Sequence, residues 1–320
     1  MVTCSLGLLL CINGHWIWFL ISAFLCGLGY GPATPASSQL LSRHLPTRYL
    51  SLGFSIKQTG VPLGGILAGL VVPWLLIRYS WQNSMLVIAT SVVVASLILQ
   101  LCRKQFDVQL EPGANLFRGN FFSSLRLVLS HPQLKLIAIA TFFFSATQQC
   151  YIYFLVTFLE SNIGWDNQKA GIALAILGAS AVLGRILWGA VADATGRSQL
   201  LIMVLAFAMA TVTLLTGLIT PEWSSISIFI LCGVFGATGA AWNGIYLAEI
   251  TRHVATEDVS RATGGGLFVT FFGVVVAPPI FGLIINLTNS FETAYIALGS
   301  ATMLIGLLLL KNQRKLGVNT

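Results

Sequence analysis

The sequence predicts an all-α membrane protein, and three observations support that prediction. Hydrophobic residues make up 56% of the chain, charged residues only 8%, and the mean hydropathy is +0.85, whereas a soluble domain carries about 25% charged residues. Apolar runs long enough to cross a bilayer, about 20 residues each, recur along the chain. These runs are continuously apolar and not alternating, which favours helices over a membrane β-barrel.

Nine complete membrane spans are expected in this chain of 320 residues. They lie near 16–41, 50–76, 82–102, 134–158, 168–192, 198–219, 224–248, 262–287 and 291–310. The apolar run 1–13 is shorter and covers only ~20 Å at 1.5 Å per residue, so we interpret it as part of a further helix. A signal peptide is the alternative, although the run has neither a positively charged start nor a small-x-small cleavage site.

Lysine and arginine collect on one side of these spans. When the loops are counted alternately, thirteen of these residues fall on one side and two, Arg78 and Lys169, on the other. Because cytoplasmic loops are rich in Lys and Arg, we expect an integral, multi-pass protein of a bacterial inner or plasma membrane with a cytoplasmic C-terminus. Anionic membrane lipids then explain the net charge of +7, and no nucleic-acid partner is expected.

The residues that carry enzyme chemistry are not grouped as an active site would need. The six cysteines lie in or near apolar spans without C-x-x-C spacing, and the four histidines are separated by long stretches. Neither pattern indicates a zinc site, and no H-E-x-x-H or G-x-S-x-G motif occurs. We therefore expect a protein that is not an enzyme, with no catalytic residue, no metal and no cofactor.

One charged, glycine-bearing stretch follows the apolar span 168–192. Its spacing, Gly189-x-x-x-Asp193-x-x-Gly196-Arg197, resembles the cytoplasmic loop motif of the major facilitator superfamily, whose members are secondary transporters built from two six-helix halves. The resemblance implies a conformational latch. In it the glycines permit a close helix approach and a tight turn, Asp193 accepts hydrogen bonds, and Arg197 pairs with an acid or a lipid phosphate.

A weak internal repeat supports the division into two halves. Residues 25–31 correspond to residues 231–237, and each segment precedes a small-residue helix end, a charged loop and a glycine-rich helix. In the family's register these segments belong to the fourth and tenth helices. The chain is therefore expected to begin within the third helix, as a truncated member of about nine complete helices that lacks helices one and two, part of helix three and the first copy of the loop motif.

This register predicts four divisions of the chain. They are an incomplete N-terminal half over 1–102 (part of helix three and helices four to six), a cytoplasmic linker over 103–132, a C-terminal six-helix half over 133–311 and a cytoplasmic tail over 312–320. From Phe121 onward the linker is either an amphipathic helix on the membrane surface, with Phe122, Leu125 and Leu129 turned to lipid, or a plain connection.

The resemblance also implies where a substrate binds, because helices one, four, seven and ten line the central pathway of family members. Polar side chains are costly in lipid, so those on the matching helices are expected to face protein or water. The candidate substrate contacts are Tyr30, Gln148, Gln149, Tyr153, Trp242 and Asn243. Bonding to neighbouring helices is the alternative role for the two glutamines and Asn243.

Two cations, Arg185 and Lys57, are expected inside the membrane. Transporters of small carboxylates in this superfamily carry an arginine four residues before the motif glycine, and Arg185 stands four residues before Gly189. Its fork geometry suits a substrate carboxylate. Both side chains have a simpler alternative, which is to snorkel toward the cytoplasmic face, and Arg185 has another, which is to join the latch. None of the ten acids lies in mid-span, so an anionic substrate would supply the missing negative charge.

A packing motif and an aromatic run complete the functional predictions. Gly60-x-Pro62-x-Gly64-Gly65 resembles the helix-packing motif of antiporters, although its glycine spacing differs. We interpret the chain as a transporter (a permease or symporter) that moves a small organic anion by alternating access, with or without a coupling proton or ion. A multidrug or metabolite exporter, suggested by the aromatic run 142–144, is one alternative. A non-transporting remnant or membrane interaction partner is the other.

Overall fold

The computed structural model describes residues 2–101 and 121–317, with side chains for 2–101 and 122–314. Within those ranges the chain consists of helices and connecting turns, and no strand occurs there. The α-helices are α1 (Val2–Leu10), α2 (Trp16–Tyr30), α3 (Ala33–His44), α4 (Leu50–Arg78), α5 (Trp81–Leu101), α7 (Phe121–Ser130), α8 (Pro132–Ser161), α9 (Asn167–Thr195), α10 (Ser198–Gly217), α11 (Ser225–Gly239), α12 (Asn243–Arg252), α13 (Val259–Thr288) and α14 (Phe291–Gly317). Most of the predicted linker lies outside the described residues.

Nine helical segments in the described ranges are long and apolar enough to cross a membrane. They are Trp16–His44, Thr47–Arg78, Trp81–Leu101, Pro132–Ser161, Asn167–Thr195, Ser198–Gly217, Ser225–Arg252, Thr256–Thr288 and Phe291–Arg314. Each coincides with one of the nine predicted spans. The prediction of an all-α membrane protein is therefore confirmed.

Two of these spans are broken into a longer and a shorter helix. In the first, α2 gives way to α3 after Tyr30, and in the second, α11 gives way to α12 after Gly239. The broken spans carry the two members of the predicted repeat, residues 25–31 and 231–237, and each member lies at the end of the longer helix. A break inside a span frees backbone carbonyls that must find other donors.

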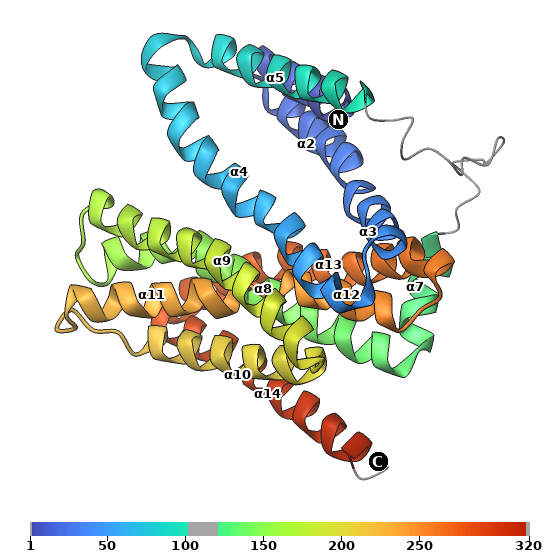
Figure 1. Ribbon diagram of the computed structural model, residues 1–320. Helices are drawn as coiled ribbons and strands as arrows, with labels where there is room; N and C mark the ends of the chain where they lie inside the picture. The colour runs from blue at the N-terminus through green and yellow to red at the C-terminus, as the bar shows by residue number, and fades with distance from the viewer. Residues whose placement is uncertain (1, 102–120, 318–320) are drawn as a thin grey trace.

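The helices form two groups that meet along α4 (Figure 1). In the first group (α1–α5), α1 packs against α2 and α5; in the second group (α8–α14), α10 packs against α14, α13 against α8, and α11 against α9. The groups meet where α4 packs against α9 and α12, and where α3 packs against α13. From that junction α4 runs outward to α5, so that α2 and α5 stand away from the second group (Figure 1).

Apolar side chains are packed differently in the two groups. In the most apolar 18-residue stretch of each span, 6% of the residues of Thr47–Arg78 are buried but 61% of those of Ser198–Gly217. The core of the second group contains large aromatic rings, including Tyr151, which stacks on Phe235 with ring centroids 3.6 Å apart. The outward apolar side chains of the first group suit a surface in contact with lipid.

Two shorter helices answer two of the predictions from sequence. Residues 2–10 form α1, as the short apolar run predicts. Residues 121–130 form α7, so the second part of the predicted linker is a helix and not a plain connection. Val128 of α7 is buried, whereas Phe122, Arg126 and Leu129 are exposed on one face of the helix. That this face lies on the membrane surface stays a prediction.

Candidate functional site

Asp193, near the end of α9, bonds to the first turn of α4. Its Oδ1 accepts a hydrogen bond from the backbone N–H of Ser51 at 3.0 Å, and its Oδ2 accepts one from Leu52 at 2.7 Å. The first N–H groups of a helix have no partner in their own helix and carry partial positive charge, and α4 has no side-chain cap of its own. Asp193 therefore caps α4 from the other group of helices.

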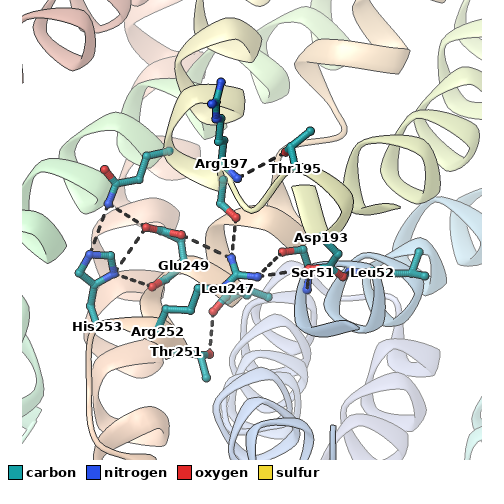
Figure 2. Close-up of polar contacts among 12 residues, drawn as sticks. Ser51, Leu52, Asp193, Thr195, Arg197, Leu247, Glu249, Thr251, Arg252 and His253 are labelled. Carbon is teal, nitrogen blue, oxygen red and sulfur yellow. Dashed lines mark hydrogen bonds and ion pairs between the residues drawn. The ribbon is translucent and has the colours of Figure 1, made fainter. Parts of the chain in front are cut away.

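Arg252, the last residue of α12, completes this contact (Figure 2). Its Nη2 lies 3.2 Å from Asp193 Oδ1 and donates to Ser51 Oγ at 2.9 Å. Its Nη1 donates to Ser198 Oγ at 2.5 Å and lies 3.5 Å from the Glu249 carboxylate. We call Ser51, Asp193, Glu249 and Arg252 the Asp193 cluster. It joins α4, α9 and α12, and each of its charged groups has a partner of opposite charge.

Arg197, the arginine of the predicted latch, lies outside the Asp193 cluster. Its backbone N–H donates to Thr195 Oγ1 at 3.3 Å, and its side chain points away from Asp193 (Figure 2). The structure thus puts Arg252, not Arg197, at the motif aspartate, while pairing of Arg197 with a lipid phosphate stays a prediction. Sequence reasoning missed Arg252. The available signal was the spacing of Glu249 and Arg252, because charges three residues apart share one helix face.

The two motif glycines occupy positions that need glycine. A Cβ on Gly189 would lie 2.5 Å from Ser55 Oγ and 2.6 Å from Ser55 Cβ, so α9 and α4 approach closely only without a side chain there. Gly244 of α12 faces the same serine at a distance equally too short for a Cβ. Gly196 ends α9 with a φ of 66°, in the left-handed region that favours glycine.

Arg185 is buried within α9, with 3% of its surface exposed. Its Nε donates to the carbonyl of Ala240 at 2.9 Å, and its Nη1 donates to the carbonyl of Gln58. Within the described residues it makes no ion pair with an acid. The guanidinium thus joins α9 to α4 and to the break between α11 and α12. This placement differs from the snorkelling expected in the simpler interpretation, and Arg185 is not part of the Asp193 cluster.

Lys57 precedes Gln58 on α4, so its backbone lies one residue from the carbonyl that Arg185 contacts. The Lys57 Nζ is buried and has no hydrogen-bond partner among the residues that the structure describes. A buried ammonium group is costly unless it is paired and hydrogen-bonded. Lys57 is therefore a positive charge that the described part of the chain does not balance.

Three of the predicted polar contacts lie together beside the same break. Gln148 Oε1 on α8 accepts hydrogen bonds from Trp242 Nε1 at 3.0 Å and from Asn243 Nδ2 at 3.5 Å. Because Trp242 and Asn243 follow Ala240 closely in the chain, this cluster and Arg185 converge on the α11–α12 break. We call Gln148, Trp242 and Asn243 the Gln148 cluster.

The other predicted contacts are more exposed. Gln149 Nε2 donates to the Tyr153 hydroxyl at 3.2 Å on the same helix, and 57% of Tyr153 is exposed. Tyr30, at the end of α2, is 49% exposed and lies within electrostatic range of Arg185. Neither tyrosine contacts the Gln148 cluster through a hydrogen bond in the described residues.

The glycines of the predicted packing motif face open space. A Cβ on Gly60, Gly64 or Gly65 would meet nothing within 4 Å, and all three residues are exposed along α4. Pro62 lies inside α4. A packing role for these glycines therefore stays a prediction about some other arrangement of the helices. In the described ranges, no group of three or more His, Cys, Asp or Glu side chains is placed to hold a metal ion.

Within the described residues, nine apolar helical segments and the polar side chains buried between them define a multi-pass integral membrane protein. The family model of the Major Facilitator Superfamily matches residues 1–255 and 137–319. The chain belongs to this superfamily, and members of this superfamily are transporters and not enzymes.

Individual relatives are more distant. An uncharacterized MFS-type transporter of Mycobacterium tuberculosis is 26% identical over 288 residues, which are 88% of this chain and 62% of the relative. The cis,cis-muconate transport protein of Acinetobacter baylyi is 24% identical over 96% of this chain and 74% of its own length. The crystal structure of the human organic anion transporter MFSD10 matches with a TM-score of 0.77 at 13% identity, covering 97% of this chain and 76% of that one. The chain thus spans less than two thirds of the first relative.

Proposed function

We propose that the chain acts in a secondary transporter that moves small organic anions, carboxylates above all, by alternating access. The observation that carries the proposal is the pair of interior cations. Arg185 bonds only to neutral carbonyls, and Lys57 Nζ has no partner among the described residues. A carboxylate that enters beside them supplies the negative charge that the described residues do not place there.

The Gln148 cluster supports an anionic ligand as well. Its geometry uses the Gln148 oxygen as the acceptor for two donors. The amide N–H groups on Gln148 Nε2 therefore remain free to donate, and a carboxylate needs hydrogen-bond donors. Gln149, Tyr153 and Tyr30 add further donors on exposed surfaces nearby. The proposed site is bounded by Arg185 and Lys57 on one side and by these polar groups on the other.

The names of two similar proteins agree with this substrate class. One relative is a transport protein for cis,cis-muconate, a dicarboxylate, and one structural neighbour is an organic anion transporter. At 24% and 13% identity these similarities support the proposal without identifying the substrate.

The arrangement of the two helix groups suggests which side the site opens to. The groups are joined at the Asp193 cluster and separate toward the far end of α4 (Figure 1). The excess of Lys and Arg in the loops favours a cytoplasmic location for the Asp193 cluster and for the C-terminus. We infer an arrangement closed toward the cytoplasm and open outward.

Uptake into proteoliposomes tests the proposal. We expect uptake of radiolabelled cis,cis-muconate or lactate, but not of glucose, and a fall of about 100-fold on Arg185→Ala, because a buried charge pair lost on one side costs roughly 3 kcal/mol. Arg78→Ala is the matched control, since Arg78 lies at the exposed end of α4 and stacks on Trp74 at 4.1 Å.

Other outcomes would contradict the proposal. Carboxylate uptake that is equal in the parent and in Arg185→Ala would exclude Arg185 as the counter-charge. Export of apolar compounds that is insensitive to Arg185→Ala would favour the exporter, and no transport of any probe would favour the non-transporting remnant.

A further inference from the structure

Pro62 leaves one backbone carbonyl of α4 without its usual partner. In an α-helix the carbonyl of residue 58 accepts from the N–H of residue 62, and proline has no N–H. Pro62 lies inside α4, so the Gln58 carbonyl must find a donor elsewhere. That donor is Nη1 of Arg185.

The second carbonyl bonded by Arg185 is also freed by a helix defect. Ala240 lies between α11, which ends at Gly239, and α12, which begins at Asn243. Its carbonyl accepts from Nε of Arg185 at 2.9 Å. One guanidinium therefore serves two carbonyls that their own helices leave unpaired, and by doing so it ties α4 of the first group to α9 and the α11–α12 break of the second.

Arg185 retains unused donors in this arrangement. Its Nη2 makes no hydrogen bond to any described residue, and only Nε and Nη1 are engaged. A carboxylate binds a guanidinium best through two parallel bonds, and such charge-assisted bonds are roughly twice as strong as bonds between neutral groups. A carboxylate that takes Nη1 and Nη2 together competes with the Gln58 carbonyl at Nη1, and it displaces that carbonyl where it takes the same N–H.

We propose that this displacement couples ligand binding to movement of the helix groups. Arg185, the carbonyls of Gln58 and Ala240, and Pro62 form a strap that holds α4 against α9 in the ligand-free protein. The substrate carboxylate replaces the Gln58 carbonyl at Nη1, and α4 is released at that level. A ligand shifts an equilibrium only through different affinities for the two states, and here the difference arises because the carbonyl competes with the ligand in one state alone. The carboxylate part of this inference rests on the proposed function.

Pro62→Ala is the test, because it returns an N–H to position 62. The Gln58 carbonyl then has a helix donor, and Arg185 is freed without a ligand. Pro73→Ala is the matched control: it makes the same change in the same helix. Its freed carbonyl belongs to Gly69 and accepts no hydrogen bond from a side chain among the described residues. Spin labels at Ile77 and Ile226, which are 85% and 70% exposed, report the distance between α4 and α11 in a variant whose cysteines are replaced by serine.

In the parent we expect cis,cis-muconate to change the Ile77–Ile226 distance distribution. In Pro62→Ala the ligand-free distribution should already resemble that of the muconate-bound parent, muconate should change it little, and muconate should bind several-fold more tightly because its competitor is gone. Pro73→Ala should behave as the parent does. Arg185→Lys, which keeps the charge but lacks the fork that reaches both carbonyls, should also lose the ligand-free distribution of the parent.

The two proposals fail separately. If Pro62→Ala keeps the parent's ligand-free distances and its muconate response while the parent transports muconate, the strap is excluded and the proposed function stands. In the opposite case, neither muconate nor lactate binds the parent, but Pro62→Ala and Arg185→Lys shift the Ile77–Ile226 distances and Pro73→Ala does not. That result would support the strap and show that the proposed substrate class is wrong.

Discussion

The Asp193 cluster and the interior cations are two charged regions at one junction, and they differ in whether their charged groups have partners of opposite charge. In the Asp193 cluster every charged group has a partner: Asp193 caps α4, and Arg252 bonds to Asp193, Ser51 and Glu249. At the level of Gln58 the cations bond to carbonyls or to nothing in the described residues. Paired charges stabilise one arrangement of the helices, whereas unpaired buried charges favour the binding of a ligand of opposite charge.

Loss of Asp193 should have the largest effect on the junction. In Asp193→Ala two N–H groups of α4 lose their acceptor and Arg252 loses its main partner. We expect the free energy of unfolding to fall by about 2 kcal/mol. This is less than the loss typical of fully buried pairs, because the Arg252 side chain is 26% exposed. The measurements are the melting temperature and the Ile77–Ile226 distance.

Asp166→Ala is the control for that experiment. Asp166 caps the first turn of the same helix, α9, through the Lys169 N–H at 2.8 Å, and no hydrogen bond among the described residues joins its side chain to the first group. Its loss should lower the melting temperature slightly and leave the distance unchanged. An Asp193→Ala protein with the parent's distance distribution would show that the Asp193 cluster does not hold the groups together.

Removal of Arg252 and removal of Arg197 should have different effects on stability. Arg252→Ala should lower the free energy of unfolding by about 1 to 2 kcal/mol, because it removes charge-assisted bonds to partly buried partners. Arg197→Ala should change it by less than about 0.5 kcal/mol, since its side chain points away from the cluster (Figure 2). Thermal unfolding in a lipid mimetic measures both changes in stability. A larger loss of stability in Arg197→Ala than in Arg252→Ala would support the predicted role of Arg197 in the latch.

Removing the charge of Lys57 should change stability and ligand binding in opposite directions. Lys57→Met removes an unpaired buried charge, so we expect stability to rise by about 1 kcal/mol while muconate binding weakens about tenfold. Lys169→Met is the control, because Lys169 lies over the Trp165 ring at 4.3 Å, outside the interior. A Lys57→Met protein of lower stability with unchanged muconate affinity would indicate a structural role for Lys57.

The smallest effect is expected at the glycines of α4. Gly60→Ala should raise stability by about 0.5 kcal/mol, because a helix interior favours alanine and no atom lies within 4 Å of the new methyl group. Gly236→Ala should destabilise, since its methyl group would lie 2.9 Å from the Leu177 carbonyl carbon. If Gly60→Ala also lowers uptake without changing muconate affinity, the predicted packing motif is used in another conformation; unchanged uptake would remove that role.

Much of the fold follows from local features of the chain. The nine spans coincide with the observed segments because each is a long apolar run, and the cost of an unpaired backbone in lipid leaves helices as the solution. Gly196 could be assigned to a tight turn from its place in the motif, since a left-handed residue after a helix is usually glycine. Arg185 could be singled out because a charge inside an apolar span is rare.

The partners of these residues could not be predicted in the same way. The carbonyl of Gln58 carries no sequence signal, and Arg252 resembles any basic residue at a span end. On sequence alone Arg197 was assigned to the latch because it ends the loop motif that contains Asp193, whereas Arg252 lies 59 residues from Asp193 and outside that motif.

The sequence by itself therefore determined that the protein lies in a lipid bilayer, where its helices are and which residues carry charge within them. These follow from composition and from the length of the apolar runs, which any segment shows without its neighbours. Only the tertiary structure decided that Asp193 caps α4, that Arg252 completes this contact and that Arg185 bonds to the carbonyl freed by Pro62. Those contacts arise where two groups of helices meet, and the geometry of that junction is set by the packing of whole helices and not by any one segment.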